Sequence, residues 1–320
     1  MGILATITET VYFIAETFNP FWFIPGWFRS WITYAFSTLG MLGSFLALFL
    51  YRNQNSLLYH PEVPGIPKDP RENPERYRNP GEWNMPYEDV IVKAEDQTEL
   101  HGWLIKQPDS AAAPTIVFFQ ENAGNMGLRL PNMYELWRRL SVNIFMVSYR
   151  GYGRSQGVPT EEGLKMDADA VLKYVSTLKQ VDPKKIVILG RSLGGAVGIH
   201  ITSMYPEKVK GLIVENSFTS IADMVDVLMP FLAIFKGLIL RIGWKSIESI
   251  KDITTPILFI SGARDELVPP SQMRKLYDAA QTSIHRTWYI VPDGGHNDTC
   301  MRNPREYCEK VKEWMQKIGL

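Results

Sequence analysis

The sequence predicts an α/β fold, in which a mostly parallel sheet of eight strands carries helices on both faces and is preceded by one membrane helix. From about residue 87, short apolar runs alternate with helical stretches, an order typical of a parallel sheet covered on both sides. The later runs are almost continuously apolar, as expected for strands buried on both faces. A long uncharged run nearer the N-terminus predicts the membrane helix.

That uncharged run covers residues 31–51 (WITYAFSTLGMLGSFLALFLY), within a predicted N-terminal anchor at 1–52. At 1.5 Å per helical residue, its length matches the ~30 Å core of a bilayer. Arg29 and Arg52 flank it, and aromatic residues stand near both ends, where interfacial side chains are expected. A buried helix of a soluble domain is the alternative. The aromatic stretch before the run is predicted to lie at the membrane interface.

Residues 53–86 are predicted as a linker between the anchor and a soluble domain at 87–320. Seven prolines in this stretch remove backbone donors and favour extended conformations. Part of the linker is free to pack on the domain.

Eight apolar runs are predicted as the strands, and helices are predicted between them. The runs are YEDVIVKA, TELHGWLI, PTIVFFQ, NIFMVSY, KIVILG, GLIVEN, PILFISG and TWYIVP. The helices are expected at about 128–140, 160–178, 193–205, 271–281 and 304–318. In such a sheet, ligands bind beyond the carboxyl ends of the strands, so functional residues are expected directly after the runs.

The charge balance and the cysteine count exclude several kinds of site. Lys+Arg and Asp+Glu both total 34, so the chain has no net charge that would attract nucleic acid. The two cysteines, Cys300 and Cys308, form no disulfide framework and match no zinc-ligand spacing, and whether they pair stays open. The five histidines show no H-E-x-x-H pattern, so no metal is implied.

The segment GRSLGG (190–195) follows the run KIVIL and precedes a predicted helix. This is the G-x-S-x-G arrangement of a nucleophile elbow, in which a serine stands on a sharp turn from strand to helix. Small residues at 190 and 194 let the strand and helix approach each other. The motif alone is weak, because glycine turns after strands are common.

A nucleophilic serine needs a histidine base and an acid that orients the histidine. Asp265 follows the run PILFISG and His296 follows TWYIVP, so both stand after predicted strands, in the chain order of the α/β-hydrolase fold. Either residue alone reads as an ordinary turn or loop residue. Together with Ser192 they predict an α/β-hydrolase fold and a catalytic triad, with Glu215 at the end of GLIVEN as the rival acid.

The oxyanion hole requires two backbone donors, one directly after the serine and one from the loop after the third strand. The first is Leu193. The second is expected in the stretch QENAGN (120–125), with Asn122 as the chosen residue and an ordinary Gly/Asn turn as the alternative. The glycine-rich loop at 151–157 fits no phosphate-binding motif and is predicted to be a structural loop that borders the site.

At these motifs the chain resembles the membrane-anchored α/β-hydrolase domain-containing protein 13 type, from the membrane segment to the C-terminus. The most specific segments are ENAGNMGLRLPN (121–132), SYRGYGRSQGVPTEEGL (148–164), GRSLGGAV (190–197), GARDELVPP (262–270) and GGHNDT (294–299). The resemblance implies the same triad, Ser192, Asp265 and His296. Related hydrolases usually carry His-Gly where this chain has Gln120-Glu121, and a carboxylate beside an oxyanion opposes catalysis unless it points away.

The stretch 218–250 follows the sixth predicted strand, where this fold commonly inserts a cap. Its segment VLMPFLAIFKGLILRIGW (227–244) is strongly apolar. It is interpreted either as a buried helix pair or as a lid or acyl-chain channel that faces the membrane. An apolar pocket near an anchored active site favours fatty-acyl groups.

The predicted protein is therefore a membrane-anchored serine hydrolase that cleaves an ester or thioester of a lipid or an S-acylated protein. We expect no cofactor, because this hydrolysis needs none. The rival hypothesis is a non-catalytic membrane scaffold with a degenerate hydrolase domain, and Glu121 is the observation that supports it. We expect a single-pass protein of the endoplasmic reticulum or plasma membrane. The resemblance suggests a signal anchor in type II orientation, with a luminal or extracellular hydrolase domain.

Overall fold

The computed structural model describes residues 25–320, so the first 24 residues of the predicted anchor lie outside the described residues. That excluded part holds most of the aromatic stretch predicted at the membrane interface. The chain divides into two compact units between Asn53 and Gln54. Helix α2 (Gly26–Leu58) crosses this boundary and departs from helical geometry at Asn53, where φ is −104° and ψ is 15°.

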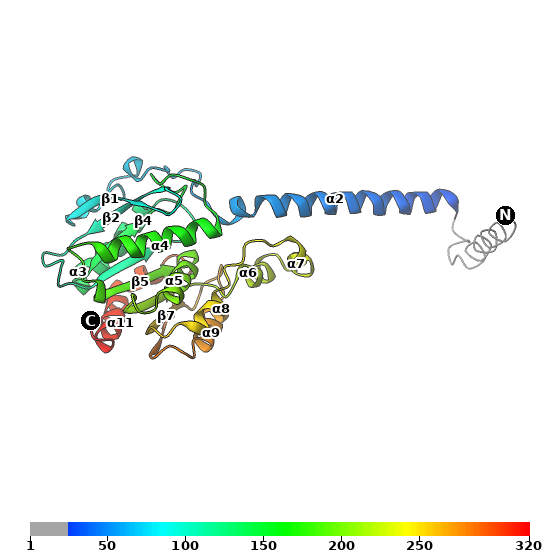
Figure 1. Cartoon of the computed structure of the whole chain (residues 1–320). Helices are drawn as coiled ribbons and strands as arrows, with labels where there is room; N and C mark the ends of the chain where they lie inside the picture. The colour runs from blue at the N-terminus through cyan, green and yellow to red at the C-terminus, as the bar shows by residue number, and fades with distance from the viewer. Residues whose placement is uncertain (1–24) are drawn as a thin grey trace, which may run out of the picture. The chain divides into compact units, whose positions relative to one another are not determined.

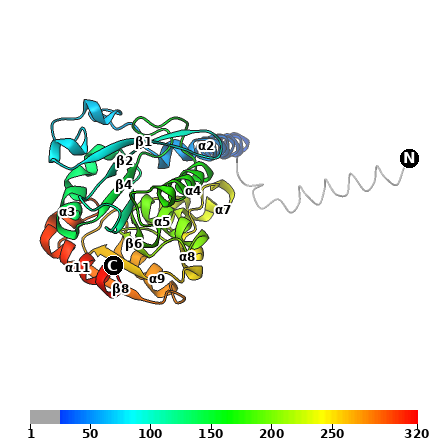
Figure 2. The same cartoon turned by 60° about the vertical axis from the view of Figure 1, so that its left-hand side comes forward.

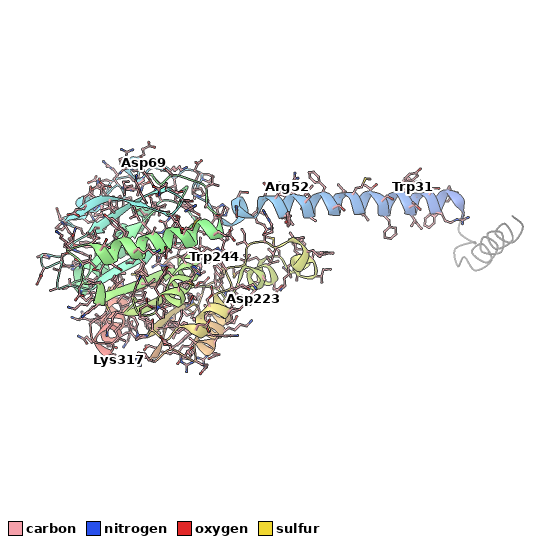
Figure 3. All side chains as sticks on the ribbon, viewed as in Figure 1. Trp31, Arg52, Asp69, Asp223, Trp244 and Lys317 are labelled. Carbon is pink, nitrogen blue, oxygen red and sulfur yellow. The ribbon has the colours of Figure 1, made fainter. Side chains whose placement is uncertain are left out.

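Helix α2 is the one helix in the described part of the chain that is long and apolar enough, by length and composition, to cross a membrane. An 18-residue window of it has a mean hydropathy of 1.6, and none of that window is buried. This is the pattern expected of a helix that meets lipid, because a core helix loses its apolar surface to neighbouring elements. Figure 3 labels Trp31 and Arg52 on this helix.

The second unit is built on a sheet that has eight strands within residues 25–320, in the order β1-β2-β4-β3-β5-β6-β7-β8. The strands are β1 Tyr87–Lys93, β2 Glu99–Ile105, β3 Thr115–Phe119, β4 Asn143–Val147, β5 Ile186–Arg191, β6 Gly211–Glu215, β7 Ile257–Gly262 and β8 Arg286–Val291. The pairs β1–β2 and β2–β4 are antiparallel and all other pairs are parallel. The predicted fold is confirmed, and each apolar run forms one strand.

Helices cover both faces of the sheet, so each face has its own apolar core. The main helices are α3 Leu130–Leu140, α4 Glu161–Thr177, α5 Leu193–Met204, α9 Pro270–Ala279, α10 Thr299–Arg302 and α11 Pro304–Lys317. One core contains Val171, Ile199 and Leu276 from α4, α5 and α9. The other contains Met133 and Trp314 from α3 and α11. Figure 2 shows α3 and α11 on one side of the strands and α4 and α5 on the other.

Side-chain caps define where several of these helices begin. The side chain of Thr160 accepts the Gly163 N–H at the start of α4, and the side chain of Asn303 caps α11 in the same way. Such caps satisfy backbone donors that have no partner within the helix. The N-cap residue of helix α5 is Ser192, whose hydroxyl makes no cap hydrogen bond.

Parts of the predicted linker pack on the domain, an arrangement that the sequence left open. Tyr59, Asn73 and Met85 are buried, and short 3-10 helices form at Pro70–Glu72 and Pro80–Trp83. The amide of Asn73 exchanges two hydrogen bonds, of 2.8 and 2.9 Å, with the amide of Asn125. The prolines therefore hold this segment in turns whose polar groups are satisfied by the domain.

The predicted cap leaves the sheet after β6 and forms four short helical segments. They are α6 Ile221–Leu228, a 3-10 helix at Pro230–Phe235, α7 Lys236–Ile239 and α8 Ser246–Ser249. Between residues 221 and 239, Met224 is the one buried residue, whereas Ile234 and Leu238 are 82% and 83% exposed. The interpretation as a buried helix pair is wrong. In Figure 1, α6 and α7 project from the body of the domain.

Candidate active site

Ser192 lies on the turn between β5 and α5, with φ +55° and ψ −119°. This left-handed φ is strained for a residue with a side chain and costs about 1–3 kcal/mol, so it persists only because the surroundings impose it. A Cβ at Gly190 would lie 2.0 Å from the carbonyl oxygen of Gly194, and a Cβ at Gly194 would lie 1.9 Å from that of Phe119. Both glycines are therefore required by the close approach of α5 to the sheet, as the motif predicts.

The structure brings Ser192, His296 and Asp265 into one hydrogen-bonded chain, although 104 residues separate the serine from the histidine. His296 Nε2 lies 2.9 Å from Ser192 Oγ, and His296 Nδ1 lies 2.8 Å from Asp265 Oδ2. Ser192 is 6% exposed and Asp265 is 5% exposed. Each residue follows the carboxyl end of a parallel strand, so all three meet at one edge of the sheet.

The carboxylate of Asp265 is held by backbone donors from its own turn. Its Oδ1 accepts the N–H of Leu267 at 3.0 Å and the N–H of Val268 at 2.8 Å. These bonds orient the carboxylate and leave Oδ2 directed at the histidine. This arrangement selects the imidazole tautomer in which Nδ1 carries the proton and Nε2 is free to accept one.

Asn216 fixes the loop that carries His296, a role that the sequence analysis missed. Its Nδ2 donates to the carbonyl oxygens of Gly295 and His296 at 3.0 and 3.1 Å, and its Oδ1 accepts the Gly262 N–H at 2.8 Å. The residue therefore joins the ends of β6 and β7 to the histidine loop. The sequence feature that could have identified Asn216 is its position directly after the run GLIVE, at the edge of the sheet where this fold places its functional groups.

Of the two predicted oxyanion donors, Leu193 is the first residue of α5 and Asn122 lies in the loop after β3. Within residues 25–320, the backbone N–H groups of Asn122 and Leu193 have no hydrogen-bond acceptor. The carbonyl of Asn122 is occupied, because it accepts the Tyr152 hydroxyl at 2.7 Å and the His60 N–H at 2.8 Å. Tyr152 belongs to the glycine-rich loop predicted to border the site. The loop is thus anchored through its carbonyl while its amide remains available.

The carboxylate of Glu121 is engaged in two buried ion pairs. Its Oε1 lies 3.1 Å from Arg191 and its Oε2 lies 2.6 Å from Nε of Arg129. Burial raises the pKa of Glu121, but the charges of Arg129 and Arg191 outweigh that effect and lower it to about 2. The carboxylate is therefore ionised and its charge is compensated by two guanidinium groups.

The rival acid, Glu215, is fully buried and belongs to the same network. One of its oxygens lies 3.0 Å from Arg191 Nε, and the other accepts the Tyr307 hydroxyl at 2.7 Å. The ring nitrogen of His296 that needs an acid is bonded to Asp265 instead. Arg191 was also missed by the sequence analysis. A charged residue inside an otherwise apolar buried motif was the signal, because buried charges require partners.

Cys300 and Cys308 are both buried and both free, so they form no disulfide. In the described part of the chain, no group of three or more His, Cys, Asp or Glu side chains is arranged to hold a metal ion.

Comparisons with known proteins agree with this architecture. Residues 114–241 match the family model of the alpha/beta hydrolase fold. The chain is 41% identical over 278 residues to the alpha/beta hydrolase domain-containing protein WAV2 of Arabidopsis thaliana, covering 83% of this chain and 88% of WAV2. It is 36% identical over 272 residues to an uncharacterized membrane protein of Saccharomyces cerevisiae, covering 84% and 91% of the two chains.

Solved structures extend the likeness at the level of the fold. The esterase Pf2001 of Pyrococcus furiosus superposes with a TM-score of 0.64 at 19% identity, covering 82% of this chain and all of that one. At this identity, the likeness shows a shared fold and no more. Because the identity to WAV2 is high and extends over most of both chains, this protein belongs to the α/β-hydrolase family, among its α/β-hydrolase domain-containing members.

Proposed function

We propose that this protein is a membrane-anchored serine hydrolase that cleaves an ester or thioester through an acyl-enzyme. The observation that carries the proposal is the hydrogen-bonded chain from Ser192 through His296 to Asp265 at the nucleophile turn. Serine, histidine and acid in this geometry, at the ends of parallel strands, are the recognised arrangement for acyl transfer.

In the proposed reaction, His296 Nε2 takes the proton of Ser192 as Oγ attacks the carbonyl carbon. Asp265 stabilises the imidazolium, and the N–H groups of Leu193 and Asn122 donate to the negatively charged oxygen of the tetrahedral intermediate. His296 then protonates the leaving alkoxide or thiolate. A water molecule, deprotonated by the same histidine, attacks the acyl-serine and releases the carboxylic acid. No cofactor takes part in these steps.

The surroundings of the site support the proposed substrate class. The apolar cap begins directly after β6, and Ser217, two residues beyond that strand, donates its hydroxyl hydrogen bond to the carbonyl oxygen of Ser192. A cap of this composition favours a fatty-acyl group, carried by a lipid or by an S-acylated protein.

The apolar helix α2 supports the membrane part of the proposal. Residues 31–51 are assigned as a single span, with the hydrolase domain on the C-terminal side. We propose that the protein resides in the endoplasmic reticulum or plasma membrane in type II orientation.

A fluorophosphonate probe tests the proposed activity, because the probe labels a serine only when a base activates it. The full-length protein in membranes is expected to react with the probe. Ser192→Ala is expected to lose the labelling, and its ester turnover should fall by up to ~10⁶-fold. Ser203→Ala on the same helix α5 is the matched control and should label normally. A folded wild-type protein that does not react would favour the scaffold hypothesis.

A further inference from the structure

The outer part of the cap carries an exposed apolar surface, which we call the apolar tip. It consists of Val227, Leu228, Phe231, Ile234, Phe235 and Leu238. Single exposed apolar side chains are ordinary, but a contiguous group on one small element marks a surface that binds something. Lys236 is the one charged residue between positions 227 and 239, and it pairs with Asp226.

The C-terminal end of the cap is bonded to the chain that follows the proposed span. Gln54 is 7% exposed, and its Nε2 donates to the carbonyl oxygen of Ile239 at 2.7 Å. Its Oε1 accepts the backbone N–H groups of Arg241 and Ile242 at 2.8 and 3.2 Å. One side-chain amide therefore satisfies three backbone groups at the point where the cap returns to the domain.

A second set of bonds holds the residues after this point. The carboxylate of Glu161 accepts the N–H groups of Gly243 and Trp244 at 2.6 and 3.1 Å. The indole N–H of Trp244 donates to the Tyr59 hydroxyl at 2.9 Å, and Figure 3 labels Trp244 in this region. The base of the cap is thus fixed by buried polar contacts, whereas the apolar tip has exposed side chains.

These contacts limit how far the cap can lie from the membrane. Gln54 follows Tyr51, the last residue of the proposed span, by three positions, so the chain between them reaches at most about 11 Å. Leu58 is also bonded to the active-site loop, because its carbonyl accepts the side-chain amide of Asn122 at 2.8 Å. The cap base and the oxyanion loop are therefore both tied to the first few residues that leave the bilayer.

We propose that the apolar tip inserts into the interface of the bilayer that the anchor spans, and that the acyl chain of the substrate enters the site from the lipid at this point. This inference rests on the proposed membrane span and deepens the proposed function. The short tether keeps the bilayer at a high effective concentration near the tip, which selects lipid over a soluble partner.

Spin labels measure the depth of the tip directly and require no activity. Ile234→Cys and Leu238→Cys are labelled with a nitroxide in full-length protein, in nanodiscs of phosphatidylcholine with and without phosphatidylserine. Ile284→Cys is the matched control, because Ile284 is a comparably exposed isoleucine (78%) that precedes β8, at the opposite edge of the sheet from the triad. We expect both tip labels to be more accessible to oxygen than to a water-soluble nickel complex, and the control label to show the reverse.

Tip labels as accessible to nickel as the control label would overturn the proposal. Dipolar broadening from a second copy, or immobilised labels without a depth signal, would also overturn it, because either result would show that the tip binds a protein partner. Protein without an introduced cysteine is treated with the nitroxide in parallel, and it should stay unlabelled because Cys300 and Cys308 are buried.

A second measurement connects the tip to catalysis. The double variant Ile234→Glu/Leu238→Glu is expected to lose about tenfold or more in turnover of a long-chain ester embedded in the bilayer, because carboxylates insert poorly. Its turnover of a water-soluble short-chain ester should stay unchanged, and Ile284→Glu should change neither. Equal loss on both substrates would contradict delivery from the lipid. If the wild type fails to react with the fluorophosphonate while the depth signal is present, the proposed activity fails and the membrane surface stands.

Discussion

Glu121→Gln tests whether the unusual carboxylate of the oxyanion loop serves stability or opposes catalysis. The substitution keeps the size of the side chain and removes the charge that faces Arg129 and Arg191. It therefore reproduces the protonated form of Glu121 at neutral pH. If the carboxylate repelled the reaction's oxyanion, this change would raise turnover. The structure predicts a loss of stability instead, with no gain in turnover.

The size of the stability loss follows from the pKa of Glu121, which is lowered from 4.5 to about 2. At ~1.4 kcal/mol for each tenfold change in proton affinity, this corresponds to about 3 kcal/mol of folding free energy at neutral pH. Removal of one partner from a buried ion pair typically costs a similar amount, ~3–5 kcal/mol. For a domain of this size, such a loss lowers the apparent melting temperature by about 10 °C.

The pH dependence has a definite sign. Because the pKa of Glu121 is lower in the folded protein, its stabilisation is complete above about pH 4.5 and is lost as the pH falls toward 2. The difference in unfolding free energy between wild type and Glu121→Gln should therefore be constant from pH 7 to 5 and shrink below 4.5. Urea midpoints of full-length protein in nanodiscs, followed by near-ultraviolet circular dichroism, measure this difference.

Glu309→Gln provides the control, because Glu309 forms an exposed ion pair with Arg305. Exposed pairs contribute at most ~1 kcal/mol, so this variant should unfold close to the wild type. Turnover is compared per active site titrated with the fluorophosphonate. A Glu121→Gln protein as stable as the wild type, with raised turnover per site, would refute the assignment of this carboxylate to the two arginines.

Two further outcomes are expected. Asp265→Asn should lower ester turnover per folded molecule far more than Glu215→Gln does. The expected loss is about 10⁴-fold, because the amide favours the wrong tautomer of His296, as in the serine-protease template. If ester kinetics showed the reverse ranking, the catalytic acid would be Glu215 at the end of β6. Arg76→Asn combined with Arg78→Thr creates a glycosylation sequon on the exposed segment before the sheet, where Arg76 already has φ +69°, a conformation that asparagine tolerates. If the domain is luminal, this variant should carry one more glycan than the wild type in cells, and an endoglycosidase should remove it. Arg76→Asn alone should carry no more than the wild type, whose own sequon is Asn297-Asp298-Thr299. A double variant that gains no glycan, and whose domain is cut by protease added to sealed vesicles, would reverse the orientation.

The sequence by itself determined the fold and the positions of the candidate triad. Strand and helix periodicity are local properties of the chain, so each run from YEDVIVKA to TWYIVP could be assigned from its own residues. A parallel sheet then brings the carboxyl ends of its strands to one edge. For this reason Ser192, Asp265 and His296 could be placed together in advance, and the structure gives them hydrogen-bonding distances.

The tertiary structure decided those features that depend on partners far away in the chain. Whether the charge of Glu121 faces the oxyanion or is compensated depends on Arg191, 70 residues later, and no local pattern encodes that pair. The proline-rich segment at 53–86 resembles a spacer in composition, but Asn73 finds its partner 52 residues away in Asn125. Apolar composition also could not decide whether the cap is buried or exposed. Hydrophobicity shows that a side chain is unfavourable in water, but only the tertiary packing shows whether another element covers it.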